Sequence, residues 1–351
     1  MTEPAASAST VPGTAPSERK WGKLLLALVA FFVMPSILWL RAFLPIENSV
    51  LLFVPALAAC CLVGWWAGGR VLLAIIWVAL AAWLAIAGAS PNDAFTNMAR
   101  GWCLLLAGAF GLVCLFGTTG AFFPRALTAL GLALGLSLMM SLVGPMRASE
   151  AKKALNAELT RRNSDTMAQL NGFISQHPRI WQQLTSKVPP MASMPAETEK
   201  LLKVLSTYGL ELFPALLALE SLAALALAWT TYHRLGRARL GLALGALRDF
   251  RFSDQLSWGV IVGLTVTFLP TLASVSGLGK NLLLFFCALY AVRGLGVLSW
   301  FFAPSVLALT LAGVFVLLVW PVNAFRLLAA AMSGVGLVDT WADLRRPRTT
   351  T

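Results

Sequence analysis

Residues 247–258 have the sequence LRDFRFSDQLSW, and two apolar runs follow, at 256–275 and 282–300. The second run contains the sequence YAVRGLG, which places Arg293, Gly294 and Gly296 inside an apolar segment. A cation within such a segment is costly in a bilayer unless protein or water surrounds it. The stretch therefore predicts a helical membrane bundle with an arginine in its interior.

The composition of the whole chain indicates that its solvent is lipid. Of its 351 residues, 58% are hydrophobic and 12% are charged, which is too little polar surface for a water-soluble globule of this size. The net charge of +12 comes from short basic blocks between apolar runs, as in cytoplasmic loops. We therefore expect the lipid bilayer as a partner and no nucleic acid. The five cysteines lie in apolar runs without a CxxC spacing, which predicts no metal and no cofactor.

Nine apolar runs approach or reach the length of about 20 residues that crosses a bilayer. They are 24–40, 50–68, 71–89, 101–122, 125–145, 208–232, 256–275, 282–300 and 303–320. Each is predicted to be helical, because lipid offers backbone amides no partner. Nine crossings from a cytoplasmic amino terminus would place the tail outside, whereas its arginines favour the cytoplasm. Either Gly294 and Gly296 break the eighth segment, or residues 325–338 return as a half-span, so eight or nine crossings remain open.

The predicted fold class is all-α: a polytopic helical membrane protein with eight or nine transmembrane segments and one extramembrane helical insertion. Its expected parts are a disordered tail (1–20), a five-helix bundle (21–145), the insertion (146–204), a second bundle (205–322) and an amphipathic basic tail (323–351). The insertion has apolar residues at helical spacing, and Pro195 is suited to open its second helix. The arginines between 233 and 251 predict a cytoplasmic loop, which places the insertion outside.

Three motifs carry a family resemblance: LRDFRFSDQLSW at 247–258, LYAVRGLGV at 289–297 and GLVDTWADLRR at 336–346. On these motifs, the chain from about residue 205 to 347 resembles the YybS-like family of predicted bacterial membrane proteins. Arg293 stands where we expect an uncharged polar residue in that family. The resemblance implies a multi-pass protein of the bacterial cytoplasmic (inner) membrane. The family's layout is distantly similar to the substrate-binding subunits of energy-coupling-factor transporters.

Two groups of residues are candidate functional sites. The first is an intramembrane polar site of Glu220, Arg293, Gly294 and Gly296. Glu220 and Arg293 each lie 12 residues from the expected outer end of their segment, at Tyr208 and Asn281. At 1.5 Å per residue both sit about 18 Å deep, so we expect an ion pair or a shared polar cavity.

The second group is a motif at the membrane interface. Asp339 and Asp343 lie four residues apart, a spacing at which paired carboxylates can hold Mg²⁺. A single pair favours a polar tail helix at the headgroups instead, and we expect no metal there. The motif consists of Asp249, Phe250, Asp254, Trp258, Asp339, Asp343 and Arg345.

Three classes of function remain open. A transporter or small-solute binding subunit, working with an ATPase partner, fits the charges within the membrane. A structural or assembly factor of the bacterial cell envelope fits an insertion that docks a membrane-protein partner. The third class is a membrane enzyme acting on a lipid-linked substrate, but no catalytic triad or phosphate-binding loop is present, so we expect no catalytic residues.

Overall fold

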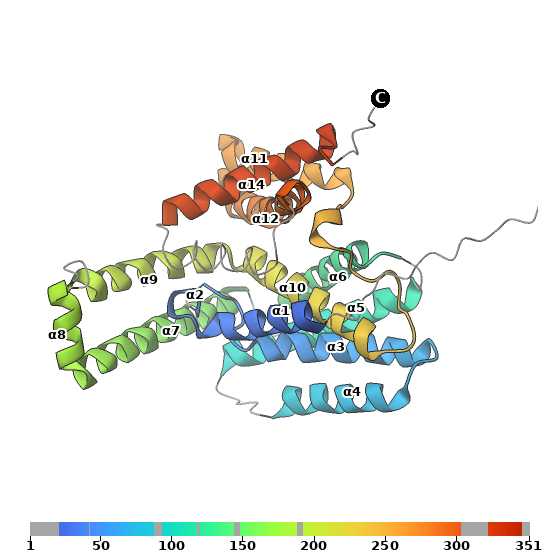
Figure 1. The fold of residues 1–351 in the computed structure, drawn as a ribbon, viewed down its shortest axis with the longest axis horizontal. Helices are drawn as coiled ribbons and strands as arrows, with labels where there is room; N and C mark the ends of the chain where they lie inside the picture. Colours follow the sequence, from blue (N-terminus) through green and yellow to red (C-terminus); the bar gives the residue numbers. More distant parts are fainter. Residues whose placement is uncertain are drawn as a thin grey trace, which may run out of the picture.

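The computed structural model describes residues 21–41, 43–87, 93–117, 120–143, 148–187, 192–302 and 322–345. Its regular structure within these ranges is entirely helical, which confirms the all-α fold class (Figure 1). The predicted disordered tail at 1–20 and the ninth apolar run at 303–320 lie outside the described residues. The first bundle contains α1 (Trp21–Val33), η1 (Met34–Ser36), α2 (Leu38–Arg41), α3 (Ser49–Trp66), α4 (Val71–Ile86), α5 (Ala94–Phe116), α6 (Phe122–Val143) and α10 (Phe213–Leu235).

Five helical segments of the described chain are long and apolar enough to cross a membrane: α3, α5, α6, α10 and the segment Pro270–Phe302. Trp21–Ser36, Val71–Ile86 and Leu327–Ala342 are apolar but shorter. This supports a polytopic helical membrane protein, while the count of eight or nine crossings stays a prediction.

The predicted seventh span at 256–275 needs correction. Helix α11 covers only Ser257–Phe268, and Leu269 is extended, with ψ of 117°. A residue before proline avoids the α conformation, and Pro270 then opens the 3₁₀ segment η5 (Pro270–Val275). The helix therefore ends in the middle of the apolar run.

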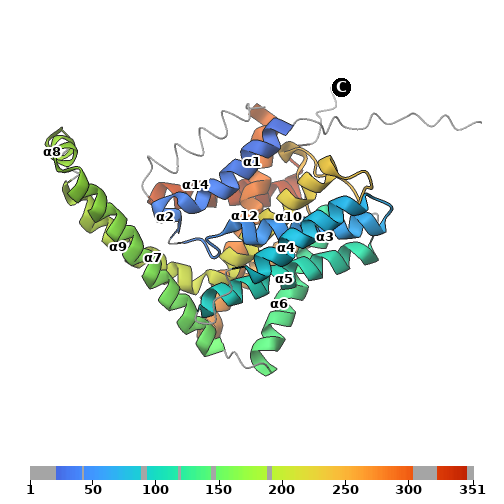
Figure 2. The same cartoon turned by 90° about the horizontal axis from the view of Figure 1, so that it is seen from below.

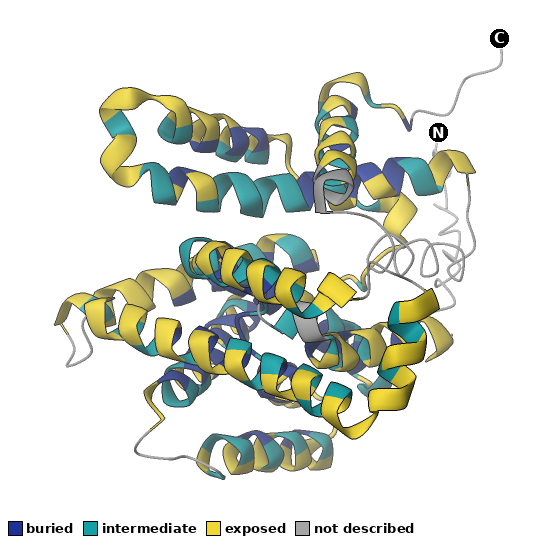
Figure 3. Cartoon of the chain, turned by 90° about the vertical axis from the view of Figure 1, so that its left-hand side faces the viewer, coloured by how far each residue is buried: buried dark blue, intermediate teal, exposed yellow. Residues whose placement is uncertain are grey.

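Helix α3 is the most buried of the candidate spans and packs against α4, α5 and α10. Phe110, Phe122 and Trp229 join α5, α6 and α10, with ring centroids 5.7–6.1 Å apart. Figure 3 shows exposed residues along the outer faces of the helices. Many of these are large and apolar, as expected where lipid is the solvent.

The insertion forms a helical arm. Helices α7 (Ala148–Gln176) and α9 (Met194–Glu211) pack side by side, and α8 (Pro178–Lys187) lies at the end farthest from the bundle (Figures 1 and 2). Pro195 lies in the first turn of α9, where we expected it. Helix α9 continues to Glu211, and α10 begins at Phe213 with Pro214 in its first turn, later than the predicted start at 208.

Helices α11, α12 (Ser276–Phe302) and α14 (Val322–Ala342) form a separate group on one side of the bundle (Figure 1). The prediction that Gly294 and Gly296 break the eighth segment is wrong, because α12 is continuous through both. A Cβ on Gly294 would lie 2.1 Å from the carbonyl oxygen of Met332, and one on Gly296 would lie 2.6 Å from that of Leu247. These glycines therefore permit close packing against α14 and the preceding loop.

Candidate functional site

Arg293 is buried, with 3% of its surface exposed. Its charge is compensated at the group of helices α11, α12 and α14, which we call the C-terminal group. Its Nε donates to Oδ2 of Asp339 at 2.8 Å, and Nη2 donates to the Asp339 backbone carbonyl at 3.2 Å. Nη1 reaches Oδ1 of Asp254 at 3.3 Å. The guanidinium also lies 5.4 Å from the centre of the Phe252 ring. Arg293 therefore joins α12, α14 and the loop before α11.

Asp339 is the centre of this cluster, because its fully buried side chain also accepts from Arg345 at 2.7 Å. Arg345 in turn donates to the backbone carbonyls of Arg248 and Phe250, at 2.8 and 3.1 Å. The two aspartates and two arginines therefore balance in charge. They hold the motif at 247–258 against the C-terminal part of α14 and Arg345. We call Arg293, Asp339, Arg345 and Asp254 the charge cluster.

The other interface-motif residues do not gather into one site. Asp249 pairs with its neighbour Arg248 at 3.6 Å, and the Phe250 ring packs on Phe252. Trp258 is 65% exposed on α11. Asp343 pairs with Arg251 at 2.7 Å.

The proposed Asp339–Asp343 carboxylate pair is therefore divided between different arginines, and this arrangement disfavours a shared Mg²⁺ ion. No group of three potential metal ligands occurs within the described ranges.

Glu220 is buried in α10, with 8% of its surface exposed, and the expected ion pair with Arg293 is absent from the described structure. Oε2 of Glu220 accepts from the backbone amide of Ile46 at 3.0 Å. Oε1 has no hydrogen-bond partner among the described residues. The hydroxyl of the adjacent Ser221 accepts a hydrogen bond from Trp102 Nε1 at 3.0 Å. One oxygen of a buried carboxylate is thus left for another group.

Arg162 fixes the loop that contacts Glu220, and the sequence did not single it out. It lies in the arm helix α7 and is only 1% exposed. Its guanidinium donates to the carbonyl of Leu44 at 2.7 Å and to Glu158 at 2.8 Å, and it lies 5.3 Å from the centre of the Phe95 ring. The spacing of Glu158 and Arg162 at i, i+4 indicates a helical pair but not its burial.

The Glu158 carboxyl, on the arm, has a shifted pKa. Burial is the largest single effect and raises this pKa, but the hydrogen bonds and the positive charges of Arg161 and Arg162 together outweigh it, and the pKa of Glu158 falls below its usual value. The base of the arm is therefore held by an ionised carboxylate between two arginines.

A polar cavity of about 370 Å³ lies beside this loop. Its walls come from the end of α1 and η1, from the α2–α3 connection and from α7. Arg41 and Glu47 supply its charged groups and form an ion pair with each other. The complete lining is Phe32, Pro35, Ser36, Arg41, Glu47, Thr166 and Gln169. No pattern in the sequence predicts this cavity, because its walls converge only in the fold.

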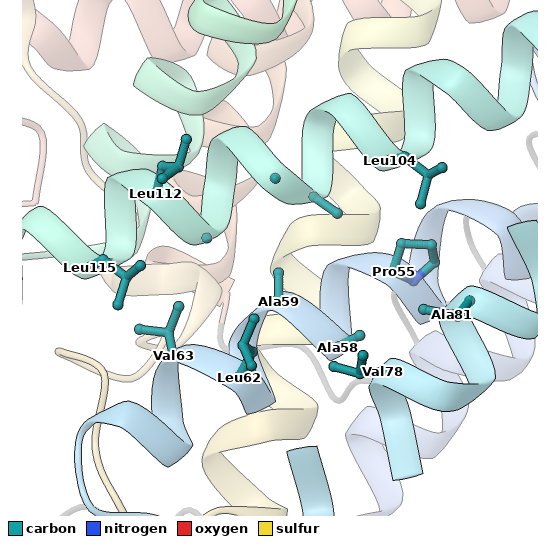
Figure 4. A pocket seen from close by; sticks show the side chains of 14 residues that line it. Pro55, Ala58, Ala59, Leu62, Val63, Val78, Ala81, Leu104, Leu112 and Leu115 are labelled. Carbon is teal, nitrogen blue, oxygen red and sulfur yellow. The ribbon is translucent and has the colours of Figure 1, made fainter. Parts of the chain in front are cut away.

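A second cavity, of about 480 Å³, is an apolar groove between α3, α4 and α5 (Figure 4). Leu104, Leu112 and Leu115 of α5 and Pro55, Ala58 and Leu62 of α3 are among the residues that line it. Its lining has only alkyl side chains and glycines, so it offers a polar solute no side-chain hydrogen bonds.

Comparison with known proteins gives one match. The model of a family described as "Predicted membrane protein (DUF2232)" matches residues 35–340. The match also covers helices α3 to α6, which the resemblance from about residue 205 to 347 left out; the YybS-like name itself stays a prediction. Neither the curated proteins nor the solved structures gave a match to this chain.

Proposed function

We propose that this chain, which belongs to the DUF2232 family of predicted membrane proteins, is a small-solute binding subunit or transporter in which Glu220 contacts the bound species. The observation that carries the proposal is that Oε1 of this buried carboxylate has no hydrogen-bond partner among the described residues. The family assignment establishes a membrane protein and leaves its activity open.

A buried carboxylate normally has partners on both oxygens, because burying an unpaired polar group costs free energy. Within a membrane span this cost is large, and ionisable residues there commonly mark solute or ion pathways. Among the described residues, the Glu220 carboxylate has one hydrogen-bond partner, the backbone amide of Ile46, which donates to Oε2. A cation, a proton or a hydrogen-bond donor of a solute would complete its coordination.

Arg293 gives the contrasting case. Its guanidinium is engaged by two carboxylates and a backbone carbonyl, so it needs no further ligand. Gly294 and Gly296 admit neighbouring backbone into the same region. We therefore assign Arg293 and both glycines to the scaffold. Of the predicted intramembrane site, Glu220 remains the candidate for contact with a ligand.

Binding by the purified protein in lipid nanodiscs tests the proposal. A panel of amino acids, sugars, nucleosides and metal cations is screened by thermal unfolding, since a ligand at about 100 times its Kd stabilises the folded state by roughly 2.7 kcal/mol. We expect at least one compound to raise the Tm of the native protein. Glu220→Gln should fold and lose that increase.

Glu211→Gln is the matched control, because Glu211 lies just before α10 and pairs with Lys280 on the surface. This variant should keep the ligand-induced increase in Tm. Equal binding by the native protein and by Glu220→Gln would contradict the role of Glu220. If no class of solute or cation is bound, the function itself is contradicted.

The arm favours a second candidate function, that of an assembly factor. Phe173, Ile180 and Met194 are 46%, 49% and 40% exposed near the end of the arm. Residues 166–196 contain no acidic residue. Cross-linking from cysteines placed at these three positions in cells tests this: recovery of one envelope protein in stoichiometric amount favours the assembly factor, whereas recovery of an ATPase favours transport.

A further inference from the structure

We infer that the polar cavity at the base of the arm binds a zwitterionic group, with its anionic end at Arg41 and its ammonium end at Glu47. This inference rests on the proposed solute-binding function and adds a binding site beside the loop that contacts Glu220, together with the chemical class of its ligand. It concerns the cavity lined by η1, the α2–α3 connection and α7.

The charges on the cavity walls determine the class of ligand. Arg41 and Glu47 are one cation and one anion, so the lining is electrically neutral. Their side chains are 20% and 29% exposed, which leaves both open to a ligand in the cavity. A ligand with a single charge would satisfy one of them and displace the other from its partner. A zwitterion replaces the ion pair with two charge-assisted hydrogen bonds.

The remaining walls fit a small molecule of this class. Ser36, Thr166 and Gln169 add polar side chains to the lining, and Phe32 adds an aromatic ring. The volume of about 370 Å³ lies at the lower end of the range for small-ligand sites. An amino acid fits such a site, and so does the headgroup of a zwitterionic phospholipid.

The cavity is connected to Glu220 through a fixed loop. Glu47 directly follows Ile46, whose amide donates to Glu220. Arg162 contacts both the loop and the cavity wall, since Nη1 donates to the carbonyl of Leu44 at 2.7 Å and Nε lies 3.5 Å from Oε2 of Glu47. A ligand that moves Glu47 therefore acts on the hydrogen bond of the buried carboxylate.

The test measures binding of two zwitterionic probes to the full chain. The first is each α-amino acid in turn, added to protein in phosphatidylglycerol nanodiscs. The second is phosphatidylethanolamine, included in the nanodiscs at increasing mole fraction. Neutral sugars and simple carboxylates are added as probes of other classes. Thermal unfolding and isothermal titration are the readouts.

We expect one zwitterionic probe to bind, and Arg41→Gln or Glu47→Gln to weaken its binding roughly tenfold or more, as loss of a charge-assisted hydrogen bond implies. Thr166→Val keeps the side-chain shape and should weaken binding without loss of folding. Asp165→Asn is the control, because Asp165 pairs with Arg161 and does not line the cavity.

The outcomes separate this inference from the proposed function. Binding of an amino acid supports a soluble solute, whereas binding of phosphatidylethanolamine alone supports a lipid headgroup in the same cavity. A zwitterion whose affinity is unchanged in all three wall variants overturns the assignment of the cavity. A bound solute that is not zwitterionic and depends on Glu220 overturns the inference but leaves the proposed function intact. If no solute, cation or lipid binds, both fail.

Discussion

Replacing Asp339 with Asn should be among the most damaging single changes in the C-terminal group. The Asp339 side chain is fully buried and accepts from Arg293 at 2.8 Å and from Arg345 at 2.7 Å. Asn keeps the shape but removes the charge, so two guanidinium groups that are 4% and 2% exposed lose their shared anion. Breaking a buried ion pair costs about 3–5 kcal/mol, and we expect Asp339→Asn to lower the free energy of unfolding by this amount.

Replacing Arg293 should lower the free energy of unfolding less than replacing Asp339. Arg293→Gln leaves Asp339 paired with Arg345 and leaves Asp254, whose side chain is 67% exposed, to be solvated by water. Its expected cost is about 1.5–3 kcal/mol, the range for hydrogen bonds to charged groups. Because both changes act on one network, the double variant Arg293→Gln, Asp339→Asn should cost less than the sum.

Unfolding by sodium dodecyl sulfate in mixed micelles, followed by tryptophan fluorescence, measures these differences. Asp249→Asn is the control, since Asp249 is 53% exposed and pairs only weakly with Arg248, so about 0–1 kcal/mol is expected. Glu220→Gln combined with Arg293→Gln should be additive, because no described ion pair joins them. The reasoning is refuted if Asp339→Asn costs no more than Asp249→Asn, or if the Glu220 and Arg293 changes are coupled.

Three further changes test the packing, the electrostatics and the topology. Gly336→Ala places a Cβ 2.0 Å from a carbonyl oxygen of α12 and should lower the free energy of unfolding by about 1–3 kcal/mol. The control Gly334→Ala meets nothing within 4 Å and should be neutral or stabilising. Equal melting temperatures of the two variants would contradict this. The pKa of Glu158 is lowered, so the stabilisation that Glu158 gives the arm is complete above the ordinary glutamate pKa of about 4.3 and is lost as the pH falls through the lowered value. Limited proteolysis of the arm at decreasing pH should show this loss. In Glu158→Gln the rate of proteolysis should depend less on pH. In a cysteine-free background, Gln169→Cys and Arg239→Cys should react with an impermeant maleimide from opposite sides of the membrane, and labelling of both from one side would contradict the predicted topology.

Composition and the lengths of the apolar runs were sufficient to predict a helical membrane protein and the approximate positions of five long segments. Helix breaks were harder to predict. Pro270 lay inside an apolar run that we treated as one span, although its effect on Leu269 ends α11 at Phe268. A break at Gly294 and Gly296 was one of two alternatives left open, and the helix is continuous there. Proline removes a backbone donor wherever it occurs, whereas the effect of glycine depends on what packs against it.

The partners of the buried charged residues also escaped prediction, because they depend on which helices pack together. Equal depth in the membrane suggested that Glu220 pairs with Arg293, but depth leaves open which helices are neighbours. The contact of α12 with α14 places Arg293 beside Asp339, 46 residues away in the chain. Asp339 was present in the interface motif, but the need of a buried arginine for an anion does not distinguish Asp339 from Glu220. With Arg293 compensated by Asp339, Oε1 of Glu220 has no hydrogen-bond partner among the described residues, and the proposed ligand contact is based on this atom.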